Sequence, residues 1–294
     1  MKPVQKKLLG LLILFLCVLL PLGLTVGKAY RESRKYELNR AVIAAVKRNN
    51  EHAVISLLSQ GADANARDLP PAGKGEAWRR LWDRLCGKPP EAVDAPTALF
   101  VALEPNLSVL YPPENAPLIK ALLDAGADVN RADRDGYTPL IRAAQTGKRE
   151  TARLLLEKGA RPDARTVFGV TPLFLAAAYG DLPTVRILLA HGASVNLRTV
   201  QGKTALHKAA FDGSIEVVRL LLSNGSDVNA REDDGSTPLA DAVIGLHAAS
   251  VELLLTCGAR VDTRDNIDRT PLSWAIARQN TQILKILTRA GAKQ

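Results

Sequence analysis

The stretch TALHKAA at Thr204–Ala210 decides the fold, because its opening pattern returns at a fixed interval along the chain. Together with Thr204, four threonines that open TPL form a series with a step of 33 residues: Thr138, Thr171, Thr237 and Thr270. A glycine that follows an apolar run keeps the same step: Gly126, Gly159, Gly192, Gly225, Gly258 and Gly291. A fixed period of this length is typical of proteins built from stacked structural repeats.

Each unit carries the local signals of two short helices. Thr138 is suited to cap the amino terminus of a first helix, and Pro139 suits its first turn. The pair Ala143-Ala144 is small enough to let neighbouring helices approach closely. Gly147 and Gly159 stand where the two helices should end in a left-handed backbone conformation. We therefore predict two helices in each unit, followed by a turn that leads into the next.

TALHKAA also matches the TPLHxA signature of the ankyrin repeat family, which the five units in register closely resemble. The resemblance implies an all-α solenoid of helix-turn-helix units with β-hairpin-like turns. It further implies that His207, at the signature's own His position, is a structural hydrogen-bonding residue.

Two more units lie upstream of the regular series. Thr97 opens a unit that ends at Gly126–Asn130, and Ala41–Asn65 reads as a first unit that lacks TPL. Insertions at about 69–93 and 104–114 lengthen this part, so we expect about seven units in an ankyrin domain at 36–294. Two local departures, Asp268 in place of the usual turn glycine and GLHAAS at Gly245–Ser250, leave the helix boundaries there open.

The amino terminus predicts a membrane segment. A basic tail at 1–7 precedes residues 8–26, nineteen residues without a charge, and a basic linker follows at 27–35. At about 1.5 Å per residue, this run is about long enough to cross a bilayer as one uncleaved helix. A secretory signal cleaved near Gly27-Lys28-Ala29 is the alternative, and would leave a secreted or periplasmic protein. The positive residues flanking the run favour a cytoplasmic carboxy-terminal side, whereas the short basic tail favours the reverse, so both orientations stay open.

Charge and composition exclude several function classes. The net charge of +9 is concentrated in residues 1–40, with eight Lys/Arg against two Asp/Glu; the remainder holds 31 against 28. A nucleic-acid binder needs a basic folded face, so we expect no nucleic-acid partner. The three cysteines and four histidines are scattered singly, which predicts no disulfide framework and no metal site. No catalytic motif or phosphate-binding loop is present in the sequence, so we expect no enzymatic activity, cofactor or small-molecule substrate.

Candidate partner-binding residues stand at the predicted tips and on exposed first-helix positions. They are Arg134, Asp135, Tyr137, Gln145, Val167, Phe168, Tyr179, Gln201, Lys203, Phe211, Asp212, Asp233, Ile267 and Arg269. Aromatic residues and Arg are enriched in binding hot spots, so we expect Tyr137, Phe168, Tyr179 and Phe211 to form one patch. A second column holds Arg142, Lys208 and Asp241, of which the last two are placed to pair with each other.

The first insertion contains EAWRRLWDRLC, Glu76–Cys86. Trp78, Leu81, Trp82 and Leu85 have the spacing of one helix face. We expect this face to cover the apolar end of the array, with docking to a membrane surface or to a partner as the alternatives.

The sequence as a whole predicts a single-pass membrane protein that binds a protein partner through a concave ankyrin surface, without catalysis. Two alternatives stay open: an exported soluble protein that shields or chaperones partners after signal cleavage, and a lipid-surface accessory that uses the Trp-bearing insertion.

Overall fold

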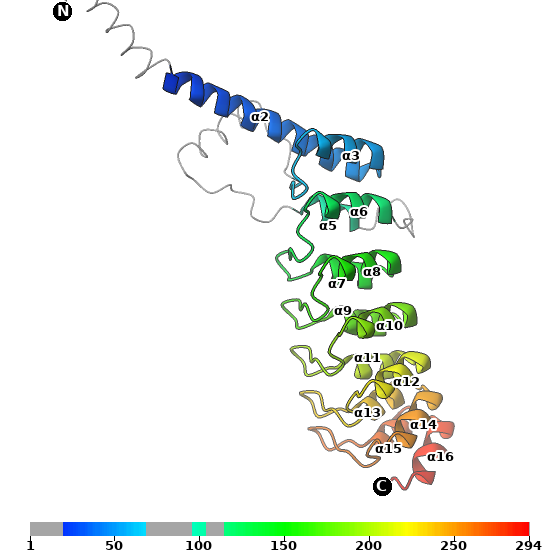
Figure 1. Cartoon of the computed structure of the whole chain (residues 1–294). Coiled ribbons are helices and arrows are strands. Elements are labelled where there is room, and N and C mark those ends of the chain that lie inside the picture. Colours follow the sequence, from blue (N-terminus) through cyan, green and yellow to red (C-terminus); the bar gives the residue numbers. More distant parts are fainter. Residues whose placement is uncertain (1–19, 69–95, 104–114, 294) are drawn as a thin grey trace, which may run out of the picture. The chain divides into compact units, whose positions relative to one another are not determined.

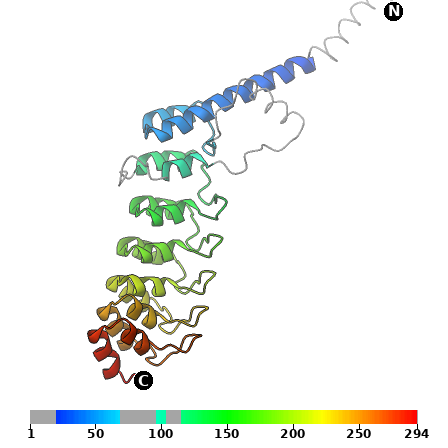
Figure 2. The ribbon, with the colours of Figure 1, turned by 180° about the vertical axis from the view of Figure 1, so that it is seen from behind.

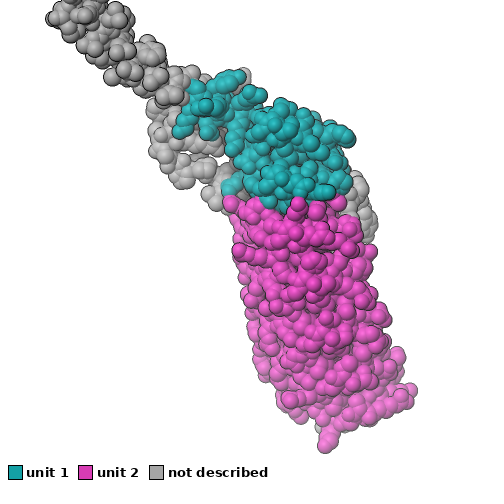
Figure 3. Space-filling view, viewed as in Figure 1, with its two compact units in different colours: residues 1–102, 117–127 teal, residues 103–116, 128–294 magenta. Residues whose placement is uncertain are grey.

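The computed structural model describes residues 20–68, 96–103 and 115–293 (Figure 1). Over these ranges the chain contains 14 α-helices and no strand, so the predicted all-α fold is confirmed for this part of the protein. The chain divides into two compact units, Met1–Ala102 with Pro117–Ala127, and Leu103–Ala116 with Asp128–Gln294 (Figure 3).

Unit 2 is a stack of helix pairs, one pair for each of the five units in the 33-residue register. Loops between successive pairs project from one side of the stack, as both ribbon views show (Figures 1 and 2). The helices are α7 (Pro139–Gln145), α8 (Arg149–Glu157), α9 (Pro172–Ala178), α10 (Leu182–Ala190), α11 (Ala205–Asp212), α12 (Ile215–Ser223), α13 (Pro238–Ile244), α14 (Ala248–Thr256), α15 (Pro271–Ala277) and α16 (Thr281–Arg289).

The predicted helix caps are confirmed. Thr138 Oγ1 accepts a hydrogen bond from the backbone N–H of Ile141, and Thr171, Thr204, Thr237 and Thr270 cap their helices in the same way. Each such cap stabilises a helix by about 1 kcal/mol. Gly147 has a φ of 67°, the left-handed conformation predicted at the end of the first helix.

The core repeats with the same step as the caps. One leucine from each second helix is fully buried: Leu155, Leu188, Leu221, Leu254 and Leu287. The alanine pairs of the first three first helices, such as Ala176-Ala177, have no exposed surface, which lets successive layers pack closely. Small residues at the contact and branched residues behind it therefore set the spacing of the stack.

The two predicted departures from the pattern keep their backbone shape without glycine, as does Gln279 in the last repeat with a φ of 54°. Leu246 has a φ of 65° and stands where other units have Gly147, Gly180 or Gly213, so the break falls at Leu246, and Gly245 has an ordinary φ of −74°. Asp268 adopts a φ of 66° in place of the turn glycine. The turn geometry is therefore kept at both sites, at a cost of about 1–2 kcal/mol for each side chain.

Unit 1 contains α2 (Leu20–Lys47), α3 (Glu51–Ser59), α5 (Ala98–Leu103) and α6 (Ala116–Asp124). Helix α2 is continuous, so the predicted linker at 27–35 is part of the same helix as the packed residue Val42. The predicted insertions at 69–93 and 104–114 lie outside the described residues. Asp68 N–H donates to Pro96 O at 2.8 Å, so the residues flanking the first insertion are hydrogen-bonded to each other.

The predicted membrane segment falls mostly outside the described part of the chain, since only residues 20–26 of the run at 8–26 belong to α2. Among the helices that the structure does describe, none has an apolar stretch of the length needed to span a bilayer.

Candidate protein-binding surface

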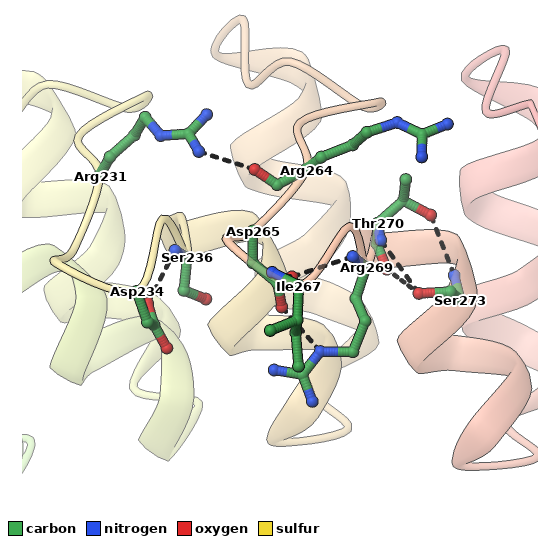
Figure 4. Close-up of polar contacts among 9 residues, drawn as sticks. All are labelled: Arg231, Asp234, Ser236, Arg264, Asp265, Ile267, Arg269, Thr270 and Ser273. Carbon is green, nitrogen blue, oxygen red and sulfur yellow. Dashed lines mark hydrogen bonds and ion pairs between the residues drawn. The ribbon is translucent and has the colours of Figure 1, made fainter.

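Hairpin-like tips connect the repeats of unit 2, and a side chain at the base closes four of the five. Asp133 Oδ1 accepts hydrogen bonds from the backbone N–H groups of Asp135 at 3.0 Å and Tyr137 at 2.8 Å. Thr166, Thr199 and Asp265 occupy equivalent positions, and each accepts a hydrogen bond from the backbone N–H four residues further on. Figure 4 shows this bond for Asp265. Two neighbouring positions are exposed at every tip, and we call these residues the tip row: Arg134, Asp135, Val167, Phe168, Val200, Gln201, Asp233, Asp234, Asn266 and Ile267.

Backbone hydrogen bonds hold successive tips side by side. Val167 N–H donates to Asp135 O at 2.8 Å, and Val200 N–H donates to Phe168 O at 2.9 Å. Beside the tips, arginines one repeat apart form a ladder in which Arg198 donates to Arg231 O at 2.9 Å. Arg231 in turn donates to Arg264 O at 2.7 Å (Figure 4). The order of the tip row along the stack is therefore fixed by the main chain.

Apolar side chains are concentrated on two adjacent tips. Val167 is 57% exposed, Phe168 59% and Val200 61%, and we call these three residues the tip patch. Ile267, at the last tip, is 67% exposed. More than half of each side chain remains in contact with water, and burial of that surface by another molecule would be favourable by about 25 cal/mol per Å².

Two predicted aromatic residues lie at the carboxyl ends of neighbouring first helices. Tyr179 follows α9 and is 63% exposed, and Phe211 in α11 is 42% exposed. The Lys208 ammonium lies 5.2 Å from the centre of the Phe211 ring and pairs with Asp212 at 2.9 Å. The predicted residues Phe211 and Asp212 thus share one lysine.

Tyr137 differs from the other predicted aromatics, because the fold itself covers it. The Arg142 guanidinium lies 4.2 Å from the centre of its ring and 3.1 Å from Asp133. Arg142 also donates to Gln145 at 3.1 Å. Two predicted binding residues, Tyr137 and Gln145, are therefore tied to one arginine inside their own repeat.

The last repeat carries the same pairing with the two residue types exchanged. Arg269 stands at the position of Tyr137, and Trp274 at the position of Arg142, with the guanidinium 4.0 Å from the indole ring. Arg269 also pairs with Asp265 at 2.8 Å (Figure 4). Burial acts to raise the pKa of Asp265, but the hydrogen bonds from Arg269 outweigh it and lower that pKa.

The fourth repeat of unit 2 contains a buried acidic pair that the sequence reasoning missed. Glu232 is 8% exposed and Asp241 6%, and Lys203 Nζ lies 3.3 Å from the Glu232 carboxylate. Burial, together with the charge of Glu232 and a hydrogen bond to it, raises the pKa of Asp241 to about 8. Burial also raises the pKa of Glu232. At neutral pH the pair therefore holds a proton on Asp241, and the ammonium of Lys203 balances Glu232.

The signal for this pair was present in the sequence. Glu232 stands where the other repeats have Asp or Thr, and its longer side chain does not accept the hydrogen bonds that close the turn. Asp234 closes this turn instead, by accepting a hydrogen bond from Ser236 N–H at 2.8 Å (Figure 4). The predicted pairing of Lys208 with Asp241 is wrong, because Lys208 reaches Asp212 within its own helix and Asp241 faces Glu232.

His207 has the structural role that the resemblance implies. It is fully buried and forms a capping box with Thr204, whose backbone N–H donates to His207 Nδ1 at 3.2 Å. Burial is the largest influence on this imidazole and lowers its pKa to about 4. His207 is therefore neutral at physiological pH.

Within the described ranges, no group of three or more His, Cys, Asp or Glu side chains is arranged to hold a metal ion. Trp78, Leu81, Trp82 and Leu85 lie outside those ranges, so the structure does not place them.

Comparison with known proteins agrees with the repeats. No curated protein sequence matches the chain significantly. A family profile described as ankyrin repeats (3 copies) matches residues 81–166, 162–232 and 224–294. This family is in general a non-catalytic interaction domain. Since these matches cover the chain from residue 81 to residue 294, the protein belongs to the ankyrin repeat family.

Proposed function

We propose that this chain is a membrane-tethered, non-catalytic module that binds a protein partner through the tip row and the exposed ends of the first helices in unit 2. The observation that carries the proposal is the tip patch, in which three large apolar side chains on adjacent tips are each more than half exposed. Isolated apolar residues on a surface need no explanation, whereas adjacent ones on a rigid scaffold favour an interaction site.

The scaffold suits this task because it is ordered before binding. The tips are held by backbone bonds between repeats, such as Asp233 N–H to Gln201 O at 3.1 Å. A preorganised surface loses little conformational freedom when a partner docks. Phe168, Tyr179 and Phe211 are the anchors expected to contribute most of the binding free energy, about 2 kcal/mol or more for each hot-spot side chain.

Cross-linking of membrane-extracted protein tests the proposal. A Phe168→Ala/Phe211→Ala variant should lose a partner that the native chain captures, while its circular dichroism spectrum stays unchanged. The matched control is Arg186→Ala/Arg219→Ala, which truncates two exposed residues on the second helices α10 and α12. Persistence of every cross-linked partner in the Phe variant, or equal losses in the control, would refute the proposal.

The tether is proposed for residues 8–26, whose nineteen uncharged residues support a single span. The mass of the mature protein tests it. Retention of residues 1–29 together with resistance to alkaline extraction from membranes is the expected result. A mature chain that begins near residue 30 and is recovered in soluble form would favour the exported, partner-shielding alternative instead.

A further inference from the structure

We infer that the partner presents an extended segment in which apolar side chains are flanked on one side by a lysine or arginine, with the apolar residues on the tip patch and the basic residue on Asp233 and Asp234. This inference rests on the proposed function and specifies the chemistry of the partner.

The order of the tips gives the surface an apolar end and an acidic end along the stack. Val200 N–H bonds to Phe168 O, Asp233 N–H to Gln201 O, and Asn266 N–H to Asp234 O, at 2.9, 3.1 and 2.8 Å. Moving along the tip row, two apolar tips are thus followed immediately by a tip with two exposed carboxylates.

The two carboxylates at this tip, those of Asp233 and Asp234, have no ion-pair partner among the residues that the structure describes. Lys203, beneath the same tip, is already paired with Glu232 at 3.3 Å.

Other basic residues on this side of the stack are engaged as well. Lys208 pairs with Asp212 at 2.9 Å, Arg264 with Asp268 at 2.5 Å, and Arg269 with Asp265 at 2.8 Å. Arg198 and Arg231 bind backbone carbonyls beside the tips and, within the described part of the chain, form no ion pair with Asp233 or Asp234. These two carboxylates are therefore available to a basic partner side chain, and they would oppose an acidic one.

The spacing of the repeats sets the spacing in the partner. Neighbouring helices of a stack lie about 8–10 Å apart, and an extended chain advances about 3.3 Å per residue. One repeat therefore corresponds to about three residues of the partner. An apolar residue on Phe168, a second on Val200 and a basic residue on Asp233 and Asp234 would follow each other at intervals of about three.

Both sides of the proposed contact are chemically matched. A guanidinium or ammonium donates to carboxylates, and the arginine fork is suited to two adjacent acceptors. The tip is narrow, with two exposed residues in each repeat, which favours a single extended segment over a broad surface. The apolar contacts would supply most of the affinity, and the charges would supply orientation and salt dependence.

Selection from a displayed library of random 12-residue peptides tests this inference on the detergent-solubilised full chain. Peptides are selected on the native protein and depleted on a Phe168→Ala/Val200→Ala variant, so that only binders dependent on the tip patch are kept. We expect the enriched sequences to carry two apolar residues and a Lys or Arg at intervals of about three. Enrichment of acidic or uncharged sequences would overturn the inference.

The leading peptide is then synthesised and titrated by fluorescence anisotropy against matched variants. Asp233→Asn/Asp234→Asn keeps the oxygen that accepts from Ser236 N–H, so the turn is preserved while both charges are removed. An exposed ion pair contributes up to about 1 kcal/mol, so we expect binding to weaken by about 5- to 25-fold for the two carboxylates together. Glu216→Gln/Glu252→Gln, with exposed carboxylates on α12 and α14, should change it less than two-fold.

The outcomes separate the two proposals. Weakened binding by the Asn variant, matched by a peptide whose basic residue is replaced with serine, supports the inference. Unchanged binding by the Asn variant, with loss in Phe168→Ala/Val200→Ala, refutes the partner chemistry and leaves the binding surface intact. Recovery of no peptide that depends on the tip patch refutes both.

Discussion

Asp241→Asn should stabilise the protein at neutral pH and have no effect in acid. The native carboxyl is 6% exposed and faces Glu232, Lys203 and Asp234. Its pKa rises from 3.8 to about 8 on folding, so between these values the folded chain keeps a proton that the unfolded chain has lost. The free energy of unfolding therefore decreases as pH rises, by about 1.4 kcal/mol per pH unit.

The neutral amide of asparagine removes this dependence while keeping the shape of the side chain. The full effect at pH 7, taken over the range from the unfolded pKa of 3.8, is about 4 kcal/mol. Side-chain relaxation and water penetration reduce such values, so we expect a gain of about 2 kcal/mol at pH 7.5. His207 acts in the opposite direction: its pKa falls from 6.5 to about 4, so its contribution grows from pH 4 to 6.5. The decrease due to Asp241 is therefore unopposed only above pH 6.5.

Urea unfolding followed by circular dichroism at 222 nm, at pH 4, 5.5, 7 and 8, measures the effect. The difference between Asp241→Asn and native protein should be near zero at pH 4 and increase through pH 8. Glu252→Gln, an exposed change on the next helix, should give a difference that stays constant with pH. A loss of stability in Asp241→Asn at pH 7.5, or a gain of equal size at pH 4, would show that the acidic pair does not hold the proton described.

Three further predictions concern the scaffold and the insertion. Leu246→Gly should raise the free energy of unfolding by about 1 kcal/mol, and with it the melting temperature, because it removes the strain of a side chain at a φ of 65°. A lower melting temperature would mean that the leucine makes a compensating contact. Leu188→Ala should destabilise the stack by about 2–5 kcal/mol in urea, since the side chain is fully buried; a change below 1 kcal/mol would contradict a tightly packed core. Trp78→Ser/Trp82→Ser should reduce binding of a chain that lacks residues 1–26 to anionic vesicles, measured by co-sedimentation, if the insertion docks on lipid; unchanged binding excludes that role.

The parts of the structure that followed from sequence are those with local causes. Thr138 caps its helix and Gly147 ends it because a threonine hydroxyl and a glycine backbone act on residues within one turn. The repeat period then specified that buried residues such as Leu155 would recur at each layer.

The parts that did not follow depend on which side chains meet across a turn. Arg142, in α7, contacts Tyr137 and Asp133, which belong to the turn before this helix. The residue spacings of helices and strands do not predict a contact between a helix and a turn. Glu232 and Asp241 lie nine positions apart and would repel as two carboxylates, so their pairing requires a proton that a sequence does not display. The continuity of α2 was missed because charged residues at 27–35 suggested a linker, although Lys, Arg and Glu are all good helix formers.

That continuous helix makes the geometry of unit 1 sensitive to length. An α-helix advances about 1.5 Å and turns about 100° per residue. Between Val26 and the packed Val42, α2 has no break in which an added residue would be absorbed. A single insertion at 27–35 would move the packed face of the first repeat by only about 1.5 Å but rotate it by more than a quarter of a circle about the helix axis. The number of residues in this stretch thus sets the direction in which the first repeat faces relative to residues 20–26. The length of this charged segment therefore fixes an angle as well as a distance.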